Sequence, residues 1–195
     1  MKKLAIGSAV LWCAAAACHA QMIPVQRNPL FNTRINPTFN TSINPRYNAS
    51  INPKYDTEIN PAYNASINPR YNSSLNPKYN SSVNPAYNSS INPKYNVELN
   101  PNYTPSVNPK ANPGWTGRYC FGLEGDLQGF LVMASHRIIL LFDKDLTWVG
   151  YAVENGGTGY NIFDLDGGWI GYYQENSEGG LNRFTVDGEW VGYAS

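Results

Sequence analysis

Side chains that bind metals or attack substrates are scarce in this sequence. Its 195 residues include three cysteines and two histidines. Removal of the first twenty residues would leave one of each, Cys120 and His136. A single cysteine cannot form an intramolecular disulfide, and clusters of Cys and His with zinc-binding spacing are absent. The sequence therefore excludes a disulfide scaffold and a zinc site, and the fold must depend on packing and backbone pairing.

A long apolar run, such as a membrane-spanning helix needs, is also missing. The first twenty residues, MKKLAIGSAVLWCAAAACHA, contain a basic start, a short apolar stretch and small residues. This order resembles a bacterial secretory signal peptide with cleavage after Ala20, and the apolar stretch is short for a membrane span. We expect an exported protein, in the periplasm, at the cell surface or outside the cell, with no transmembrane span in the mature chain. Lipoprotein anchoring at Cys18 is the alternative.

Net charge is absent overall but not locally. The formal charge is zero at pH 7, yet residues 27–111 hold eight basic and three acidic side chains, and residues 112–195 hold four basic and eleven acidic ones. The basic part is too weakly charged for nucleic-acid binding, and an exported chain is separated from nucleic acid, so no nucleic-acid partner is expected. The opposite signs suggest self-association, in which the acidic part of one molecule binds the basic part of another.

An eight-residue repeat occupies residues 28–111, after a lead at residues 21–27. Asn-Pro recurs eleven times from Asn28 to Asn108 at a constant spacing of eight residues. In ten of the eleven copies an aromatic residue lies three positions after the Asn, and in ten an aliphatic residue precedes it. A fixed period this short indicates a repeat architecture. The octapeptide pattern is not assigned to a family.

Proline dictates the local structure of each octad. It fixes φ at the value that a type I turn requires, and the Asn before it can accept a hydrogen bond from the backbone two residues on. A continuous helix is excluded, because each interior proline would cost about 3 kcal/mol. Two architectures fit: a β-solenoid with aliphatic and aromatic residues stacked in ladders, or an extended, turn-rich stalk. We favour the solenoid, with most tyrosine rings used for packing.

The third octad position carries charge and should face water. From residue 46 it runs basic, basic, alanine, and this order occurs twice. The period of three octads is consistent with three octads per coil and with duplication in blocks of three. Tyrosine rings beside Asn amides and bases also form a candidate surface for glycans or other envelope polymers. The candidate binding residues of the array are Tyr47, Tyr55, Tyr63, Tyr71, Tyr79, Tyr87, Tyr95, Arg46, Lys54, Arg70 and Lys78.

A second repeat, of 21 residues, fills the C-terminal part. It shows in the row Phe121, Phe142, Phe163 and Phe184, and in the later row Leu127, Trp148, Trp169 and Trp190. Asp-Gly pairs at 166–167 and 187–188 are strong turn signals between alternating apolar segments. Each unit is most simply two antiparallel strands, so four units predict a meander of seven or eight strands, as a curved sheet, small barrel or propeller-like ring. The Phe and Trp rows should form its core.

The Asp-x-x-Gly-x-Trp-Val-Gly pattern of residues 142–195 resembles bacterial Trp-Gly (WG-type) β-hairpin repeats. The resemblance implies a β fold and no chemistry. Trp148, Trp169 and Trp190 are further candidate binding residues because they are aromatic. Residues 112–117, NPGWTG, end the octads and are predicted to be a hinge before a β domain at 118–195.

Few residues point to catalysis. Cys120 and His136 would be needed together for a nucleophilic dyad, as in a hydrolase, but a buried structural cysteine is the favoured interpretation. Asp164 and Asp166 form a fragment of a calcium-binding loop that lacks the closing glutamate, so they are interpreted as turn residues, with a weak Ca²⁺ site as the alternative. We therefore expect no cofactor and no resident metal.

The sequence thus predicts an exported, non-enzymatic structural or spacer protein of the cell envelope, whose octad array presents a C-terminal β domain that binds a partner such as a surface protein. The alternative is a glycan- or envelope-polymer-binding module that uses the tyrosine, asparagine and lysine rows of the array. A hydrolase using Cys120 and His136 is the third hypothesis.

Overall fold

A computed structural model describes residues 23–195, so the predicted signal peptide, residues 1–20, lies outside the described residues together with Cys13 and Cys18. The described chain is all-β and contains no α-helix; its helical elements are 3-10 turns. These are η1 (Val25–Arg27), η2 (Ala49–Ile51), η3 (Ser81–Val83), η4 (Ser89–Ile91), η5 (Val97–Leu99) and η6 (Pro105–Val107). Over residues 23–195, no helix has the length and apolar character needed to cross a bilayer.

Eight antiparallel strands form a closed barrel in which each strand pairs with the next and β8 pairs with β1. They are β1 (Arg118–Phe121), β2 (Leu127–Met133), β3 (Ile138–Asp143), β4 (Trp148–Glu154), β5 (Gly159–Phe163), β6 (Trp169–Glu175), β7 (Leu181–Thr185) and β8 (Trp190–Ala194). Each 21-residue repeat supplies two strands. This confirms the prediction of an antiparallel meander of four hairpin repeats, and of the three arrangements left open it is the small barrel, whose closure leaves the sheet without an unpaired edge.

The hairpin turns form where the sequence places Asp and Gly. Asp164 Oδ1 accepts hydrogen bonds from the backbone N–H of Asp166, at 3.0 Å, and of Gly168, at 2.7 Å. Gly167 has φ 77° and Gly188 has φ 83°, a region that L residues avoid. Leu146 occupies the same place in another repeat with φ 67°. The carboxylates are therefore turn formers, as the sequence suggests.

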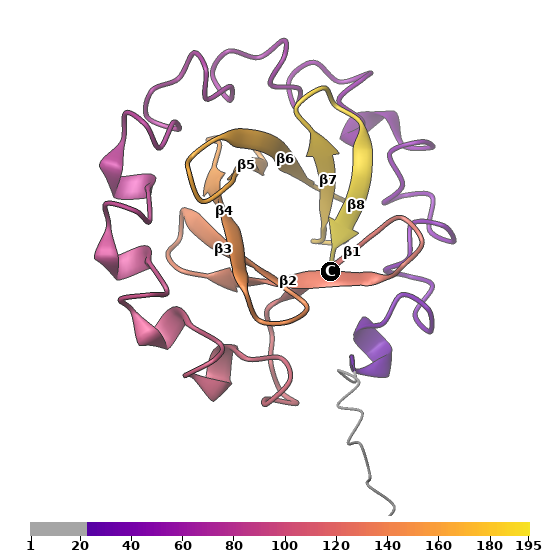
Figure 1. Ribbon diagram of the computed structural model, residues 1–195. Coiled ribbons are helices and arrows are strands. Elements are labelled where there is room, and N and C mark those ends of the chain that lie inside the picture. Colours follow the sequence, from indigo (N-terminus) through magenta and orange to yellow (C-terminus); the bar gives the residue numbers. More distant parts are fainter. Residues whose placement is uncertain (1–22) are drawn as a thin grey trace, which may run out of the picture.

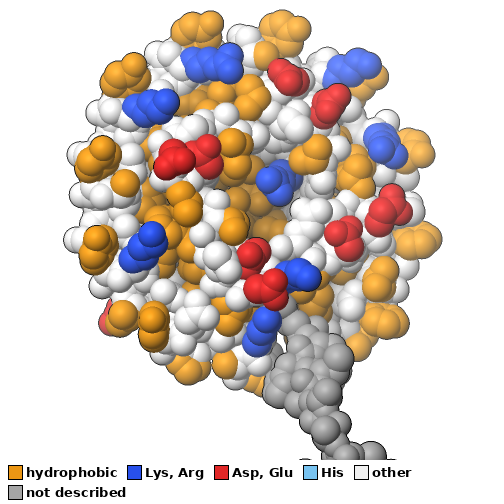
Figure 2. All heavy atoms as spheres, in the orientation of Figure 1, with side chains coloured by type: hydrophobic (Ala, Val, Ile, Leu, Met, Phe, Trp, Pro, Cys, Tyr) orange, Lys and Arg blue, Asp and Glu red, His pale blue; other side chains and the backbone are white. Residues whose placement is uncertain are grey.

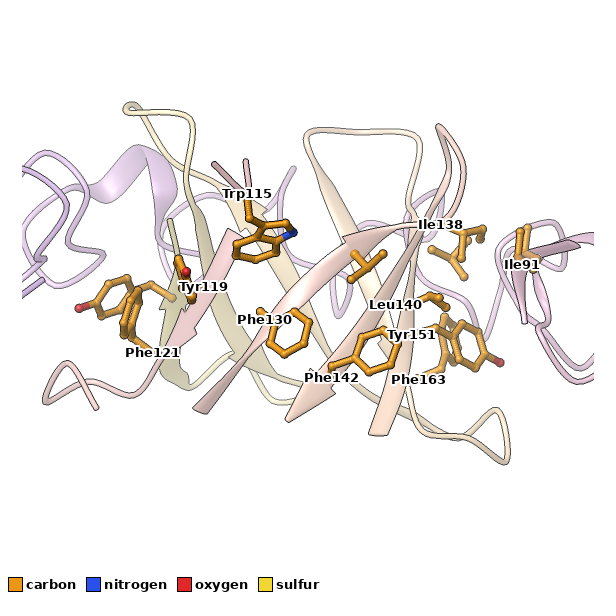
Figure 3. Packing of buried hydrophobic residues seen from close by; sticks show 14 residues of the cluster. Ile91, Trp115, Tyr119, Phe121, Phe130, Ile138, Leu140, Phe142, Tyr151 and Phe163 are labelled. Atoms are coloured by element: carbon orange, nitrogen blue, oxygen red, sulfur yellow. The ribbon is translucent and has the colours of Figure 1, made fainter. Parts of the chain in front are cut away.

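The two faces of the barrel wall differ in composition. Alternate residues face inward and form a small core of aliphatic side chains around Tyr173. The outward face carries aromatic rings in neighbouring pairs, of which Figure 3 shows Phe130 beside Phe142 and Tyr151 beside Phe163. The pairs are Phe121–Tyr193, Phe130–Phe142, Tyr151–Phe163 and Tyr172–Phe184, with centroids 5.3–5.6 Å apart. The Phe row is thus a core row, as predicted, whereas Trp148, Trp169 and Trp190 remain only half-buried at one end of the strands.

The octads cover this outward face. Residues 23–116, which we name the belt, pass around the barrel as a nearly complete ring (Figure 1). Val83 and Ile91 of the belt belong to the same apolar cluster as Phe121, Phe130 and Phe142 of the barrel wall. The barrel therefore has two cores, one inside its wall and one between its wall and the belt.

The belt is neither of the two predicted architectures. Its backbone hydrogen bonds join residues three or four positions apart, and no ladder joins one octad to another. The octads lie one after another around the barrel, so they do not stack as a solenoid and do not extend away as a stalk. The physical reason is that the proline and the aliphatic residue before it give each octad an apolar edge, which the neighbouring octads do not cover. This edge packs against the aromatic wall of the barrel and is thereby removed from water.

Within each octad, some side chains point toward the barrel and others point to solvent. All eleven prolines of the Asn-Pro pairs are buried, and most of the aliphatic residues before them are buried as well. The tyrosines three positions after each Asn point to solvent and are 65–77% exposed. The expectation that most tyrosines pack was therefore wrong. In these turns the proline and the preceding aliphatic residue supply the packing face, which leaves the tyrosine on the opposite side.

The belt and the barrel share one register. Arg46, Arg70 and Lys94, spaced by 24 residues, lie over Trp190, Trp169 and Trp148, which are spaced by 21 residues in the opposite order. Two buried asparagines repeat the match: Asn182 donates to Ile43 O at 3.1 Å and Asn161 donates to Ile67 O at 2.8 Å. Three octads therefore correspond to one hairpin, which explains the three-octad period of the basic positions.

The two ends of the belt meet at Arg27. Its guanidinium donates to Trp115 O at 2.7 Å and to Gly117 O, and it lies over the rings of Trp115 and Tyr119 at 5.2 and 4.8 Å. Burial lowers the pKa of Arg27, but an arginine stays charged at neutral pH. Trp115 is buried against Tyr119 and Phe130. Residues 112–117 are therefore a packed corner that closes the belt, where a hinge was expected.

Candidate functional site

The outer circumference of the molecule carries a row of aromatic rings. Tyr47, Tyr55, Tyr63, Tyr71, Tyr79, Tyr87 and Tyr95 are the candidate tyrosines of the sequence, and Phe31, Phe39 and Tyr103 continue the same row. Figure 2 shows hydrophobic side chains at intervals around this rim. We name these ten residues the aromatic rim. Because their side chains are mostly exposed, the packing of the fold does not account for their size.

The asparagine side chains of the octads form hydrogen bonds within the belt itself. In each octad Asn-Pro pair from Asn36 to Asn108, the Asn amide nitrogen donates to the carbonyl of the proline seven residues earlier, as Asn68 does to Pro61 at 2.7 Å. Its Oδ1 accepts from the backbone N–H two residues on, that of Arg70, at 2.8 Å. Asn72, after a tyrosine, donates to Ser66 O and accepts from Ser74. These amides hold successive octads together, so a glycan would meet tyrosine rings without free asparagine amides.

Basic and indole side chains meet in grooves at the seam between belt and barrel. The best defined, which we name the Trp169 groove, has a volume of about 190 Å³ and is lined by Pro69, Arg70, Asn76, Lys78, Phe163, Gly167 and Trp169. The guanidinium carbon of Arg70 lies 5.3 Å from the centre of the Trp169 ring. The indole N–H of Trp169 donates to Gly171 O at 2.8 Å, which fixes the ring on its strand. The structure thus brings together Arg70, Lys78 and Trp169, which the sequence named separately.

Basic residues lie over the other two tryptophans as well. Arg46 lies 5.5 Å from the Trp190 ring, and the same register brings the octad of Lys54 to this repeat, where the Lys54 ammonium lies 5.7 Å from the ring of Tyr55. At Trp148 a groove is lined by Lys94, Asn102 and Asp145. Lys94 lies 5.9 Å from the Trp148 ring, and Asn102, in place of the second base, donates to Leu146 O at 3.1 Å. The octads beside Trp169 and Trp190 therefore each supply two bases, and those beside Trp148 supply one.

Three buried tyrosines of the barrel wall present hydroxyl groups that have no hydrogen-bond partner among residues 23–195: Tyr151, Tyr172 and Tyr193. Burial raises the pKa of each of them well above the usual range. A Cβ atom at Gly167 would lie 3.5 Å from the Tyr151 hydroxyl, and one at Gly188 would lie 3.5 Å from the Tyr172 hydroxyl. The remaining repeat has Phe130 and Leu146 at the corresponding positions. At 3.5 Å such a Cβ would be in ordinary contact with the hydroxyl, so the positive φ of Gly167 and Gly188, rather than space for the tyrosines, accounts for these glycines.

Cys120 and His136 are not brought together. The thiol of Cys120 lies 3.7 Å from the Tyr173 hydroxyl, and burial raises its pKa to about 11. His136 is exposed in the turn between β2 and β3. Among the described residues no hydrogen bond joins the two side chains, so the geometry of a nucleophile and its base is not present there.

The acidic side chains of the described chain do not gather into a cation-binding cluster. Within residues 23–195 no group of three or more His, Cys, Asp or Glu side chains is arranged to hold a metal. Asp164 uses one carboxylate oxygen for its own turn, and Asp166 is exposed. The single ion pair of the described residues joins Arg34 to Glu178 at 2.7 Å, between belt and barrel. The opposite charges of the two halves thus face each other within one molecule.

No family model, curated protein or solved structure matches this chain.

Proposed function

We propose that this protein is an exported, non-enzymatic binding protein whose aromatic rim attaches to a glycan polymer of the cell envelope or its surroundings. The observation that carries the proposal is the row of ten large aromatic side chains, Tyr and Phe, that are 65–77% exposed while the same octads bury the proline of each Asn-Pro pair. Large exposed aromatic surface is uncommon on a protein with no partner and is a feature of interaction sites.

Tyrosine suits such a surface. Its ring offers a flat apolar face, its hydroxyl remains hydrated, and only two side-chain torsions must be fixed on binding. A pyranose ring also has apolar faces edged by hydroxyl groups, so tyrosine and sugar are matched in polarity. Each contact is weak, but rings repeated at a constant interval can engage successive units of a polymer, and linked contacts raise the overall affinity by about 10²–10⁴. The regular octad supplies that repetition.

A spacer role for the array has less support. A spacer would hold the β domain away from another part of the chain, whereas the belt covers the wall of that domain. The belt and barrel therefore act as one body, and a partner must meet the rim, the seam or the ends of the barrel. The resemblance of residues 142–195 to Trp-Gly hairpin repeats adds no ligand to this proposal.

The test is co-sedimentation of the chain with insoluble polysaccharides: cellulose, chitin and peptidoglycan. Replacement of Tyr63, Tyr71, Tyr79 and Tyr87 by Ser should abolish retention on whichever polymer the native protein binds. The matched control replaces Ser73, Ser81 and Ser89, which are exposed on the same octads, by Ala. The control should bind as the native protein does. Retention that is equal in all three proteins would overturn the proposal.

A further inference from the structure

The Trp169 groove holds two cations without counter-ions. Neither the Arg70 guanidinium nor the Lys78 ammonium makes a hydrogen bond to, or an ion pair with, another group of residues 23–195, where Arg34–Glu178 is the one ion pair. Like charges that line one groove repel each other, and this repulsion is an energetic cost to the folded protein. An anion between them would remove that cost.

The groove fixes the backbone that carries the two exposed cations. Asn76 donates to Pro69 O at 2.8 Å and accepts from the backbone N–H of Lys78 at 2.9 Å, so one side chain fixes the octad turns that carry Arg70 and Lys78. The guanidinium carbon of Arg70 lies 5.3 Å from the centre of the Trp169 ring. A guanidinium placed over an aromatic face can still form two parallel hydrogen bonds to a carboxylate or phosphate through its N–H groups. No carboxylate lines this groove.

The combination of an arginine, a lysine and a tryptophan recurs around Trp190 but is incomplete around Trp148. Around Trp190, Asn52 donates to Pro45 O and accepts from the backbone N–H of Lys54, as Asn76 does in its own octad. Arg46 again lies on the indole. Around Trp148 the second base is Asn102, and Asp145 lines the groove. The Trp190 repeat therefore has the same residue set as the Trp169 groove, and the third repeat is an internal comparison that keeps the indole and one base.

We propose that the Trp169 groove binds an anionic group of the glycan, a carboxylate or a phosphate ester, between Arg70 and Lys78, and that the equivalent surface at Trp190, with Arg46 and Lys54, binds a second one. The inference rests on the proposed function and deepens it, because it makes the ligand an anionic polymer: the aromatic rim contacts sugar faces, and the grooves beside it contact the charged substituents. Two sites per molecule on one seam can engage one strand of polymer at two points.

The experiment is affinity electrophoresis of the full mature chain in gels containing polygalacturonate, which carries carboxylates, poly(glycerol phosphate), which carries phosphates, or neutral dextran. We expect one of the anionic polymers to retard the native protein more than dextran does, and the polymer that does so identifies the anion. The double variant Arg70→Gln, Lys78→Gln should lose affinity by about tenfold or more, the value of a charge-assisted contact. Adding Arg46→Gln and Lys54→Gln should reduce the retardation to that seen in dextran, because only the contacts of the aromatic rim remain.

The matched control is Lys110→Gln, Lys144→Gln, which removes the same charge at exposed positions away from all three tryptophans. It should retain nearly native affinity. Equal loss in both double variants would mean that only net charge matters, and it would overturn the inference. Binding to neutral polymers that depends on the tyrosines, without any preference for anionic ones, would also overturn it but leave the proposed function intact. Absence of binding to every polymer would defeat both. Melting temperatures of all variants verify that the fold is kept.

Discussion

Arg27 offers the sharpest test of how the belt is held. Arg27→Met keeps the length and the apolar stem of the side chain but removes the charge and the donors. Two bonds from the guanidinium to the carbonyls of Trp115 and Gly117 are lost, together with the contacts to two rings. Hydrogen bonds to a charged group are worth about 1.5–3 kcal/mol each, and each cation–π contact about 0.5–1 kcal/mol.

These gains are partly offset in the native protein because half-burying a guanidinium costs hydration, which is why burial lowers the pKa of Arg27. A net loss of about 3 kcal/mol remains, which corresponds to a fall in melting temperature of about 6–12 °C for a chain of this size. The matched control is Arg34→Met, since Arg34 forms an ion pair but its side chain is 76% exposed. Exposed pairs are worth about 0–1 kcal/mol.

Thermal unfolding followed by near-ultraviolet circular dichroism gives the melting temperatures, and hydrogen exchange locates the change. In Arg27→Met the amides of residues 25–40 should exchange faster than in the control, because the free end of the belt opens first. Equal melting temperatures for the two variants would refute the assignment of Arg27 as the residue that closes the belt. A lower melting temperature with unchanged exchange at residues 25–40 would refute it as well.

Three further outcomes follow from the packing. Tyr172→Phe removes a buried hydroxyl that has no partner, so urea denaturation should show equal stability or a gain of up to about 1 kcal/mol, and a clear loss would mean that the hydroxyl is bonded. Phe163→Ala should cost about 3–5 kcal/mol in the same assay, whereas Tyr71→Ala, at an exposed ring, should change stability by less than about 0.5 kcal/mol. Burial raises the pKa of Cys120 to about 11, above the value of about 8.5 for a free thiol. The native thiol should therefore resist a disulfide reagent at pH 8 and react fully in urea, and the contribution of Cys120 to stability should be full below pH 8.5 and be lost as the pH rises toward 11; rapid labelling of the native protein would contradict this.

The barrel could be predicted from the sequence because its signals are local. Asp-Gly pairs mark the turns, the intervening segments alternate, and the 21-residue spacing of Phe163 and Phe184 counts the hairpins. Closure of β8 onto β1 was one of three arrangements that the same signals allow. What selects it is the pairing of Phe121 with Tyr193, which continues the aromatic row across the junction.

The path of the belt could not be predicted in the same way. Each Asn-Pro turn is specified by its own octad, but a chain of such turns can follow a coil, a line or a circle with the same local geometry. The missing information is the partner of the apolar edge. Two features indicate that the barrel is this partner. The first is the period of 24 residues that relates Arg46 to Arg70. The second is the aromatic outward face of the barrel, because an apolar face of this size is uncommon on a surface exposed to water.

The two repeats depend on each other for a core. The cluster between them joins Val83 and Ile91 of the belt to rings of the barrel wall, so each part, taken alone, would expose its own half of that cluster. Octad residues outside this cluster differ in type from one octad to the next. Octads that agree in their buried prolines carry Arg70, Lys78 or Ala62 at the position over the seam, with the same turn in each case. The inward residues of the octad thus determine the fold, and the outward residues, to which the proposed function assigns the ligand contacts, can change without altering the turn.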